Sequence, residues 1–445
     1  MFDESDIFRR GVEFLKKKDY EQAVESFTSA IQVNPQYIEA YYCRGNAYEA
    51  QGLFDQAVEN YDAVLQFAPK ESAAYFNRAC IFRKKGQNET AIREFTKAID
   101  LKPDYGKAYY NRGAVYFSIG NIDLSLTDYT KAIECSPKDP DPYVARGLIY
   151  IVKQKPETAL ADYDKALEID PKHFRARGNR GNALEVLGRN GEAIKEYTAV
   201  IEITPQDYKA YMNRGFIYSK IQDSEKALAD YSRAIELNPK YAKAYCCRGA
   251  VYALLKRQQK ALEDYEEAIR LAPQNIDAYI SRGQAKLAMS DQIGAIEDFN
   301  LALKMQPDNA KAWLNRAAVR SKLGNSEEAI ADYTDAIRCA PKNVAAYCSR
   351  GVLYTKTGKL AEAVADYKKA IELDPNHLGA YLNLGIVYRI QSEFKQAIQN
   401  FSQIIKLNPN YTAAYQNRAI TYNMIGNKEK AEKDLATAKE LETKK

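Results

Sequence analysis

The chain has 445 residues, more than one compact core usually contains, so it holds either several domains or an array of repeats. Its net charge of +5 is small against 64 basic and 59 acidic residues, and no run of like charge indicates a nucleic-acid arm. Seven cysteines without a CxxC pair, no apolar signal segment and no membrane-spanning stretch predict a cytoplasmic protein without membrane insertion.

Proline recurs at a fixed interval of 34 residues along almost the whole chain. The series is Pro35, Pro69, Pro103, Pro137, Pro171, Pro205, Pro239, Pro273, Pro307, Pro341, Pro375 and Pro409. After an N-terminal extension of residues 1–3, this spacing divides residues 4–445 into thirteen repeats, which begin at 4, 38, 72 and so on to a last repeat at 412–445. The sequence therefore predicts a tandem array with no room for another folded domain.

Each repeat has the pattern of two helices joined by a turn. In the repeat 106–139, Tyr109, Gly113 and Tyr116 follow helical spacing, and Gly120 marks the turn. A second helical pattern then continues to Pro137. We number positions from the first residue of each repeat, so that positions 8 and 20 hold small residues that let the two helices approach closely. Such a hairpin has a thin core, and stacking on its neighbours should bury the remaining apolar face.

The last helix should close the array. The stretch NKEKAEKDLATAKELETKK, residues 427–445, is charged on nearly every turn. Terminal repeats of solenoids need a polar outer face for solubility, so we expect the last repeat to act as a C-terminal cap.

This pattern resembles the tetratricopeptide repeat family over essentially the whole chain. The residues that match the family signature are illustrated by Trp313, Gly351, Tyr354, Ala363, Tyr367, Ala370 and Pro375. The resemblance implies an all-α fold, a right-handed superhelical α-solenoid of helix-turn-helix repeats, whose first helices line a concave groove. It also implies a protein-protein interaction scaffold.

The sequence departs from the family at position 7, where the family has leucine. Arginine stands there in all repeats but the twelfth, which keeps Leu384; the arginines are Arg10, Arg44, Arg78, Arg112, Arg146, Arg180, Arg214, Arg248, Arg282, Arg316, Arg350 and Arg418. Position 23 is acidic in ten of these repeats, namely at Glu94, Asp128, Asp162, Glu196, Asp230, Asp264, Asp298, Asp332, Asp366 and Asp434. Repeat 12 has Asn400 instead, whereas repeats 1 and 2 combine arginine with Ser26 and Asn60. We interpret the arginines as structural partners of these carboxylates. The alternative, an exposed arginine ladder that binds phosphate or RNA, stays open.

No group of residues indicates catalysis, a cofactor or a metal. His173 and His377 follow repeat prolines without an acid, serine or cysteine at a fixed spacing. Cys246 and Cys247 are adjacent but lack a second pair for zinc, and most of the 34 tyrosines occupy three core positions. We therefore expect a protein that is not an enzyme and has no cofactor.

Asparagine recurs at position 6, on the helix face that should line the groove. These residues are Asn77, Asn111, Asn179, Asn213, Asn315, Asn383 and Asn417. A row of amides could hold the backbone of an extended peptide, because each amide both donates and accepts hydrogen bonds. The row resembles the asparagine ladder in the tetratricopeptide array of a glycosyltransferase. The alternative is that asparagine is merely tolerated on a solvated face.

The middle repeats add positive charge to this face. Arg175, Lys209 and Lys243 occupy position 2 of repeats 6, 7 and 8, and Asn182 lies at position 9 of repeat 6. The same repeat has Arg177 in place of its aromatic residue and Gly178 in place of a larger one, which should make room for a ligand. An acidic or phosphorylated peptide is the expected guest. Position 5 is never lysine, which argues against the carboxylate clamp of the family's chaperone-tail binders.

The sequence thus predicts a cytoplasmic scaffold that binds extended peptide segments of protein partners. Two alternatives remain: a non-catalytic subunit that binds RNA or another polyanion, although nucleic acid is the less expected partner, and a targeting subunit of an enzyme complex such as a glycosyltransferase. The oligomeric state is not indicated by the sequence.

Overall fold

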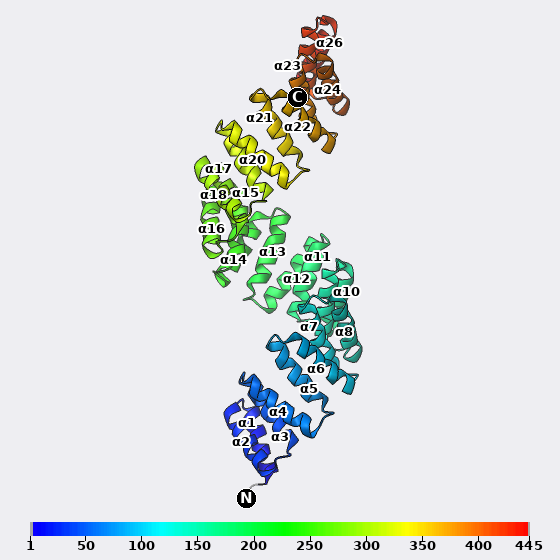
Figure 1. Ribbon diagram of the computed structural model, residues 1–445, viewed down its shortest axis with the longest axis vertical. Coiled ribbons are helices and arrows are strands. Elements are labelled where there is room, and N and C mark those ends of the chain that lie inside the picture. The colour runs from blue at the N-terminus through cyan, green and yellow to red at the C-terminus, as the bar shows by residue number, and fades with distance from the viewer. Residues whose placement is uncertain (1–2, 444–445) are drawn as a thin grey trace. The chain divides into compact units, whose positions relative to one another are not determined.

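The computed structural model describes residues 3–443, so Met1 and Phe2 of the predicted extension and the last two residues of the predicted cap lie outside the described residues. Within this range the secondary structure consists of 26 α-helices. The chain forms two compact units, Met1–Asp223 and Ser224–Lys445, and we describe each by itself (Figure 1).

The helices follow one another with short turns between them. The first unit contains α1 (Glu4–Lys16), α2 (Tyr20–Val33), α3 (Ile38–Ala50), α4 (Phe54–Phe67), α5 (Ser72–Lys84), α6 (Asn88–Leu101), α7 (Gly106–Ser118), α8 (Ile122–Cys135), α9 (Pro140–Val152), α10 (Pro156–Ile169), α11 (Phe174–Val186), α12 (Asn190–Ile203) and α13 (Tyr208–Lys220). The second contains α14 (Ser224–Leu237), α15 (Ala242–Leu254), α16 (Gln258–Leu271), α17 (Ile276–Ala288), α18 (Gln292–Met305), α19 (Ala310–Lys322), α20 (Ser326–Cys339), α21 (Val344–Lys356), α22 (Leu360–Leu373), α23 (Leu378–Ile390), α24 (Phe394–Leu407), α25 (Thr412–Met424) and α26 (Lys428–Thr443). The helix-turn-helix repeats predicted from the sequence are confirmed.

The turn inside each hairpin requires a left-handed backbone at position 15. Gly120, the turn residue predicted between α7 and α8, has φ +79°, and glycine adopts this conformation without steric cost. In several repeats another residue takes the same conformation, for example Gln154 with φ 56° and Ser290 with φ 66°. The backbone geometry is therefore kept even where the glycine signal is missing.

Small residues set the distance between the two helices of a hairpin. A Cβ added to Gly113 on α7 would lie 3.1 Å from ring atoms of Tyr129 on α8, which is tighter than ordinary contact. At the same position Gly147 packs against the ring of the fully buried Tyr163. Glycine at position 8 thus makes the space that the aromatic residue at position 24 fills.

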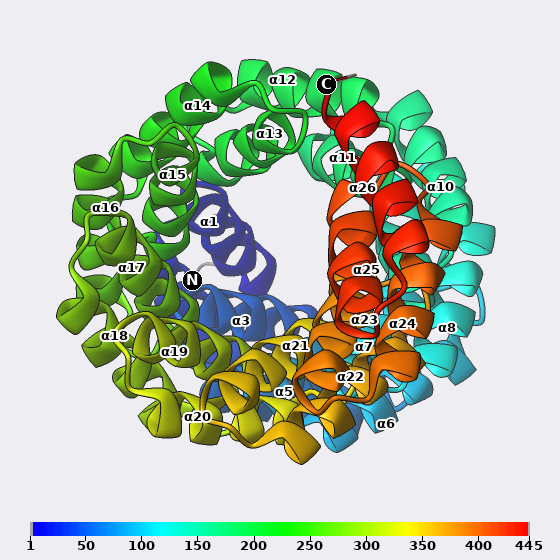
Figure 2. The same cartoon turned by 90° about the horizontal axis from the view of Figure 1, so that it is seen from above.

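Consecutive hairpins stack, and within each unit the two helices of a hairpin lie on different sides. α2 packs on both α1 and α3, and α10 packs on both α9 and α11. Within each unit the odd-numbered helices line the inner side and the even-numbered helices the outer side (Figure 2). The predicted groove-facing residues therefore belong to the inner helices.

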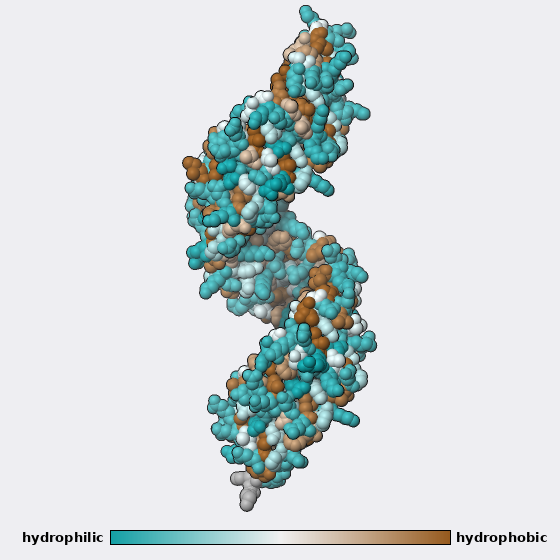
Figure 3. Space-filling view, in the orientation of Figure 1, coloured by the Kyte–Doolittle hydropathy of each residue, from teal (hydrophilic) through white to brown (hydrophobic). Residues whose placement is uncertain are grey.

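The surface that Figure 3 shows is mostly hydrophilic. On the face seen in Figure 3, apolar side chains are scattered among polar ones. No helix among residues 3–443 is both long enough and apolar enough to cross a membrane.

Candidate peptide-binding site

The recurring arginine at position 7 is an internal ion-pair partner. Arg350 Nε donates to Asp366 Oδ2 at 2.8 Å and its Nη2 to Oδ1 at 2.7 Å, joining α21 to α22. The side chains of Arg350 and Asp366 are only 14% and 6% exposed. The same pairing is present in Arg78–Glu94, Arg112–Asp128, Arg146–Asp162, Arg180–Glu196, Arg248–Asp264, Arg282–Asp298, Arg316–Asp332, Arg350–Asp366 and Arg418–Asp434. The predicted Arg–carboxylate pairing is confirmed for these nine pairs.

The same arginine also contacts the preceding repeat, which sequence reasoning missed. Arg350 Nη1 donates to Thr334 Oγ1 of α20 at 2.9 Å, and its guanidinium lies 5.9 Å from the ring centre of Tyr347. The hydrogen bond to Asp366 raises the pKa of Arg350 above its ordinary value. Arg350 therefore joins the two helices of its own hairpin and links them to the preceding repeat.

The repeats without an acid at position 23 support this interpretation. In repeat 12, Leu384 is buried in an apolar cluster, and Asn400 Nδ2 donates to Gln396 O of its own helix. In repeat 2, Arg44 Nε donates to Asn60 Oδ1 at 2.8 Å, so a neutral amide replaces the carboxylate. Repeats 2 and 12 thus occupy positions 7 and 23 without a carboxylate.

Five of the predicted peptide-binding residues line one pocket on the inner side of the first unit. The pocket has a volume of about 380 Å³ and lies between α11 and α13. It is lined by Leu148, Phe174, Arg175, Gly178, Asn179, Asn182, Tyr197, Val200, Asp207, Lys209, Ala210 and Asn213. We call it the α11–α13 pocket. It combines two cations and three amides with an apolar wall.

Two of the three amides hold each other in place. Tyr197 Oη donates to Asn182 Oδ1 at 2.6 Å, and Asn213 Nδ2 approaches the same oxygen at 3.5 Å. Burial raises the pKa of Tyr197, so its hydroxyl stays a donor. By contrast, the Asn179 side chain makes no hydrogen bond to any residue between 3 and 443, which leaves its donor and acceptor available to a ligand.

The two cations of the pocket are exposed. Arg175 and Lys209 form no ion pair within the described part of the chain, and each lies beside an aromatic ring, at 5.8 Å from Phe174 and 6.0 Å from Tyr208. The one acid that lines the pocket, Asp207, uses its side chain to accept a hydrogen bond from the Lys209 backbone at 2.9 Å. The pocket thus presents positive charge to a ligand.

The absence of a side chain at Gly178 leaves open space in the pocket. A Cβ added there would meet no heavy atom within 4 Å, so the site is open above the helix. From the sequence, Arg177 is expected to make further room because it replaces an aromatic residue. Instead its guanidinium donates to Pro171 O at 3.0 and 2.8 Å and pairs with Glu196 at 3.2 Å. It replaces the tyrosine that bonds the same carbonyl elsewhere, as Tyr245 does to Pro239 O at 3.3 Å.

Several of the other predicted asparagines have hydrogen-bond partners that Asn179 lacks. Asn77 Nδ2 donates to Tyr42 Oη at 2.9 Å and to Asn46 Oδ1 at 3.1 Å, which occupies both of its hydrogens. Asn111 and Asn417 each donate to a carbonyl of their own helix. Position 6 is therefore partly used for internal structure.

Besides Asn417, three predicted residues lie in the second unit, and their surroundings differ from those of the α11–α13 pocket. Asn315 Oδ1 accepts from Gln284 Nε2 at 3.4 Å, whereas its Nδ2 is buried without a partner among residues 3–443. Asn383 forms no side-chain hydrogen bond in the described part of the chain. Lys243 on α15 is exposed.

The corresponding pocket of repeats 2 and 3 has the opposite charge. It has a volume of about 410 Å³ and is lined by Glu39 and Glu71 together with Tyr42, Cys43 and other residues of α1, α3, α4 and α5. The inner side of the first unit therefore carries an acidic pocket and, farther along the chain, the basic α11–α13 pocket. A long ligand would meet both signs of charge.

Comparisons with known proteins identify the repeat family. Models described as tetratricopeptide repeat match residues 38–71, 106–139, 144–208, 208–241, 242–275, 299–331, 344–377, 379–411 and 400–433. A model described as TPR repeat matches residues 11–52 and 80–120. A comparison with curated proteins finds no similar sequence.

Several solved structures are similar to this chain. Cut9–Hcn1 of the APC/C hetero-tetramer is 14% identical, with 95% of this chain and 96% of the other covered and a TM-score of 0.46. Yeast Tom70 is 17% identical, with 92% and 96% covered and a TM-score of 0.43. YrrB, described as a TPR protein with an unusual peptide-binding site, is 27% identical, with 41% and 95% covered and a TM-score of 0.36.

The repeat length, the helical hairpins and the glycine–aromatic contact between their helices agree with these family matches, which together cover most of the sequence. The chain belongs to the tetratricopeptide repeat family.

Proposed function

We propose that this protein is an interaction scaffold that binds an extended acidic peptide segment in the α11–α13 pocket. Membership of the tetratricopeptide repeat family supports a protein-binding role. The observation that carries the more specific proposal is the open space above Gly178, next to the Asn179 amide and the exposed cations Arg175 and Lys209.

The chemistry of the pocket fits a peptide with carboxylate side chains. Asn179 would exchange hydrogen bonds with the peptide backbone, because its amide is both a donor and an acceptor. Arg175 and Lys209 would attract carboxylates, and Phe174 and Leu148 would cover apolar parts of the ligand. Many weak contacts of this kind would add along the inner helices.

The pairing of the position 7 arginines argues against the alternative in which they form a ladder that binds RNA or another polyanion. Nine of them are engaged with carboxylates of their own repeats. A ligand that used this ladder would have to replace partly buried internal pairs, which is costly. A polyanion would therefore have to use exposed cations elsewhere, such as Arg175 and Lys209, rather than these paired arginines.

The proposal can be tested by filling the pocket. Gly178→Leu places a side chain in the open space without meeting a neighbour at its Cβ, and helical leucine is more favourable than glycine. We expect this variant to fold at least as well as the wild type. We also expect it to bind a peptide of alternating serine and glutamate roughly tenfold more weakly.

A matched control is Asn417→Ala, which removes an amide at the same repeat position whose hydrogens serve its own helix. Asn179→Ala should weaken binding of every peptide by about 1 kcal/mol, whereas Asn417→Ala should leave binding unchanged. Fluorescence anisotropy with the labelled peptide measures each affinity. Wild-type affinity in folded Gly178→Leu would contradict the proposal.

A further inference from the structure

The first repeat breaks the ion-pair rule in a way that leaves its arginine unused. Arg10 occupies position 7, but position 23 is Ser26, whose Oγ donates to Gln22 O at 2.8 Å. Among residues 3–443 Arg10 has neither an ion pair nor a hydrogen bond, and its guanidinium lies 5.7 Å from the ring centre of Phe14. It therefore lacks the carboxylate found in most other repeats.

The second acceptor of the motif is also missing for Arg10. Arg44 bonds Thr28 and Arg112 bonds Thr96, each on the second helix of the preceding repeat. Arg10 itself is exposed. Among residues 3–443 Arg10 therefore bonds no acceptor of either kind.

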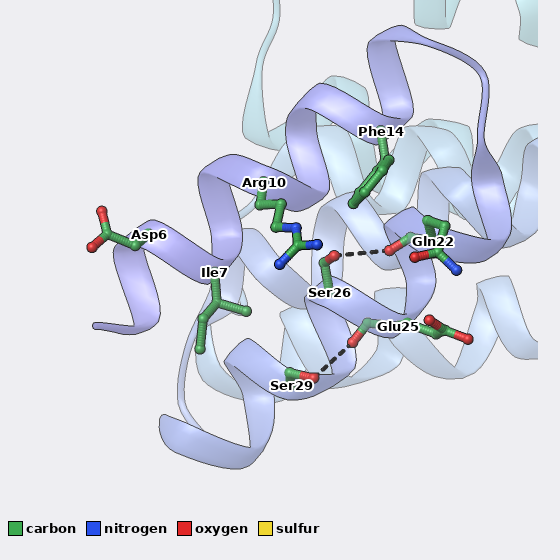
Figure 4. Close-up of a pocket in the computed structure, with 8 residues that line it drawn as sticks. All are labelled: Asp6, Ile7, Arg10, Phe14, Gln22, Glu25, Ser26 and Ser29. Carbon is green, nitrogen blue, oxygen red and sulfur yellow. Dashed lines mark hydrogen bonds between the residues drawn. The ribbon is translucent and has the colours of Figure 1, made fainter. Parts of the chain in front are cut away.

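A pocket takes the place of these acceptors. It has a volume of about 410 Å³ and is lined by Asp6, Ile7, Arg10, Phe14, Gln22, Glu25, Ser26 and Ser29. Figure 4 shows the Arg10 guanidinium pointing toward Ser26, with Phe14 on one side and Ile7 on the other. The pocket is therefore formed by α1 and α2, and among its lining residues it holds a cation, two serine hydroxyls and no carboxylate that pairs with the cation.

We propose that this pocket binds an aspartate or glutamate side chain supplied by a partner protein. Nine repeats provide the template, in which the same arginine meets a side-chain carboxylate, as Arg112 meets Asp128 with both N–O distances at 2.8 Å. The planar fork of arginine matches a carboxylate in this bidentate arrangement. Ser26 and Ser29 would turn their hydroxyls to donate to the same group.

The two acids that line the pocket do not fill this role. Asp6 accepts from Arg9 Nη2 at 2.7 Å, so it is already paired. The Glu25 side chain extends away from Arg10 in Figure 4, and its backbone carbonyl accepts from Ser29 Oγ at 3.0 Å. The positive charge of Arg10 is therefore left for an external carboxylate.

The test uses the full chain and a defined carboxylate. The probe is aspartate with both backbone ends capped as amides, and capped asparagine is its neutral control at equal ionic strength. We expect capped aspartate to shift the Arg10 Nε–H resonance in a saturable manner, whereas capped asparagine leaves it in place. Loss of that resonance in Arg10→Lys identifies it.

Ser26→Asp provides a second test, because it gives repeat 1 the acidic residue that ten other repeats have at position 23. The variant should move the Arg10 resonance to the range of the paired arginines and abolish its response to capped aspartate. Ser26→Asn, which copies repeat 2, controls for the size of the new side chain. An Arg10 resonance that ignores capped aspartate, responds only to inorganic phosphate, or still titrates in Ser26→Asp would overturn the proposal.

Discussion

Removing one member of a position 7 ion pair should destabilise its hairpin far more than removing both. Arg350→Leu leaves Asp366, which is 6% exposed, without the two hydrogen bonds at 2.8 and 2.7 Å. Exposed pairs contribute about 0–1 kcal/mol, whereas breaking a fully buried pair costs about 3–5 kcal/mol. With Arg350 still 14% exposed, we expect a loss of roughly 2–3 kcal/mol.

Adding Asp366→Asn should recover at least half of this loss. The double variant copies repeat 12, where Leu384 is buried and the Asn400 side chain bonds a carbonyl of its own helix. Asp366→Asn alone should cost less than Arg350→Leu, because the long arginine side chain can move its charge toward solvent. The double variant's loss minus the sum of the two single losses gives the coupling free energy between Arg350 and Asp366.

Hydrogen exchange is the suitable assay, because a repeat array does not unfold in one step. The free energy of local opening should fall in α21 and α22 for Arg350→Leu and rise again in the double variant. Helices α7 and α8, which hold the separate pair Arg112–Asp128, serve as the internal control. Strictly additive losses in the double variant would refute the pairing argument.

Three further predictions concern turns, thiols and helix packing. Ser290→Gly, at φ 66°, should stabilise its hairpin by about 0.5–1 kcal/mol, measured by hydrogen exchange of α17 and α18. Gly113→Val should cost about 1–3 kcal/mol in thermal unfolding, because its new atoms meet the Tyr129 ring. Burial raises the pKa of four thiols to about 11, so at pH 8 native labelling by a disulfide reagent should be roughly 100-fold slower than labelling in urea. Unfolded thiols ionise near pH 8.5, so the stability these groups contribute should be present below about pH 8.5 and lost as pH rises toward 11. These thiols are Cys43, Cys80, Cys246 and Cys348.

The fold could be predicted because its signals are local and periodic. A proline after each hairpin except the last, a small residue at the helix crossing and a turn residue such as Gly120 act within a few residues of where they stand. The Arg350–Asp366 pair was also predictable, since two charged positions vary together between repeats. Ser290 shows the limit, because it adopts φ 66° at the turn although serine does not indicate this conformation.

The details of the site depended on contacts between repeats, which the sequence does not display. The acceptor at position 25 varies among Thr334, Asn300 and Asp164, so no single residue type marks it. The asparagines at position 6 look alike in sequence, yet Asn77 is held by the previous repeat and Asn179 is not. Their difference follows from the residues that each neighbouring repeat presents.

The most direct test of the proposed peptide site is a charge exchange at Lys209, an exposed cation of the α11–α13 pocket. Lys209→Glu should weaken the serine–glutamate peptide roughly tenfold and strengthen the matching serine–lysine peptide, because the charge at one contact is reversed. Titration calorimetry of both peptides against both proteins gives the four affinities, with circular dichroism as the folding control. A crossed preference is the predicted result, and equal shifts for both peptides, or none, would contradict the account.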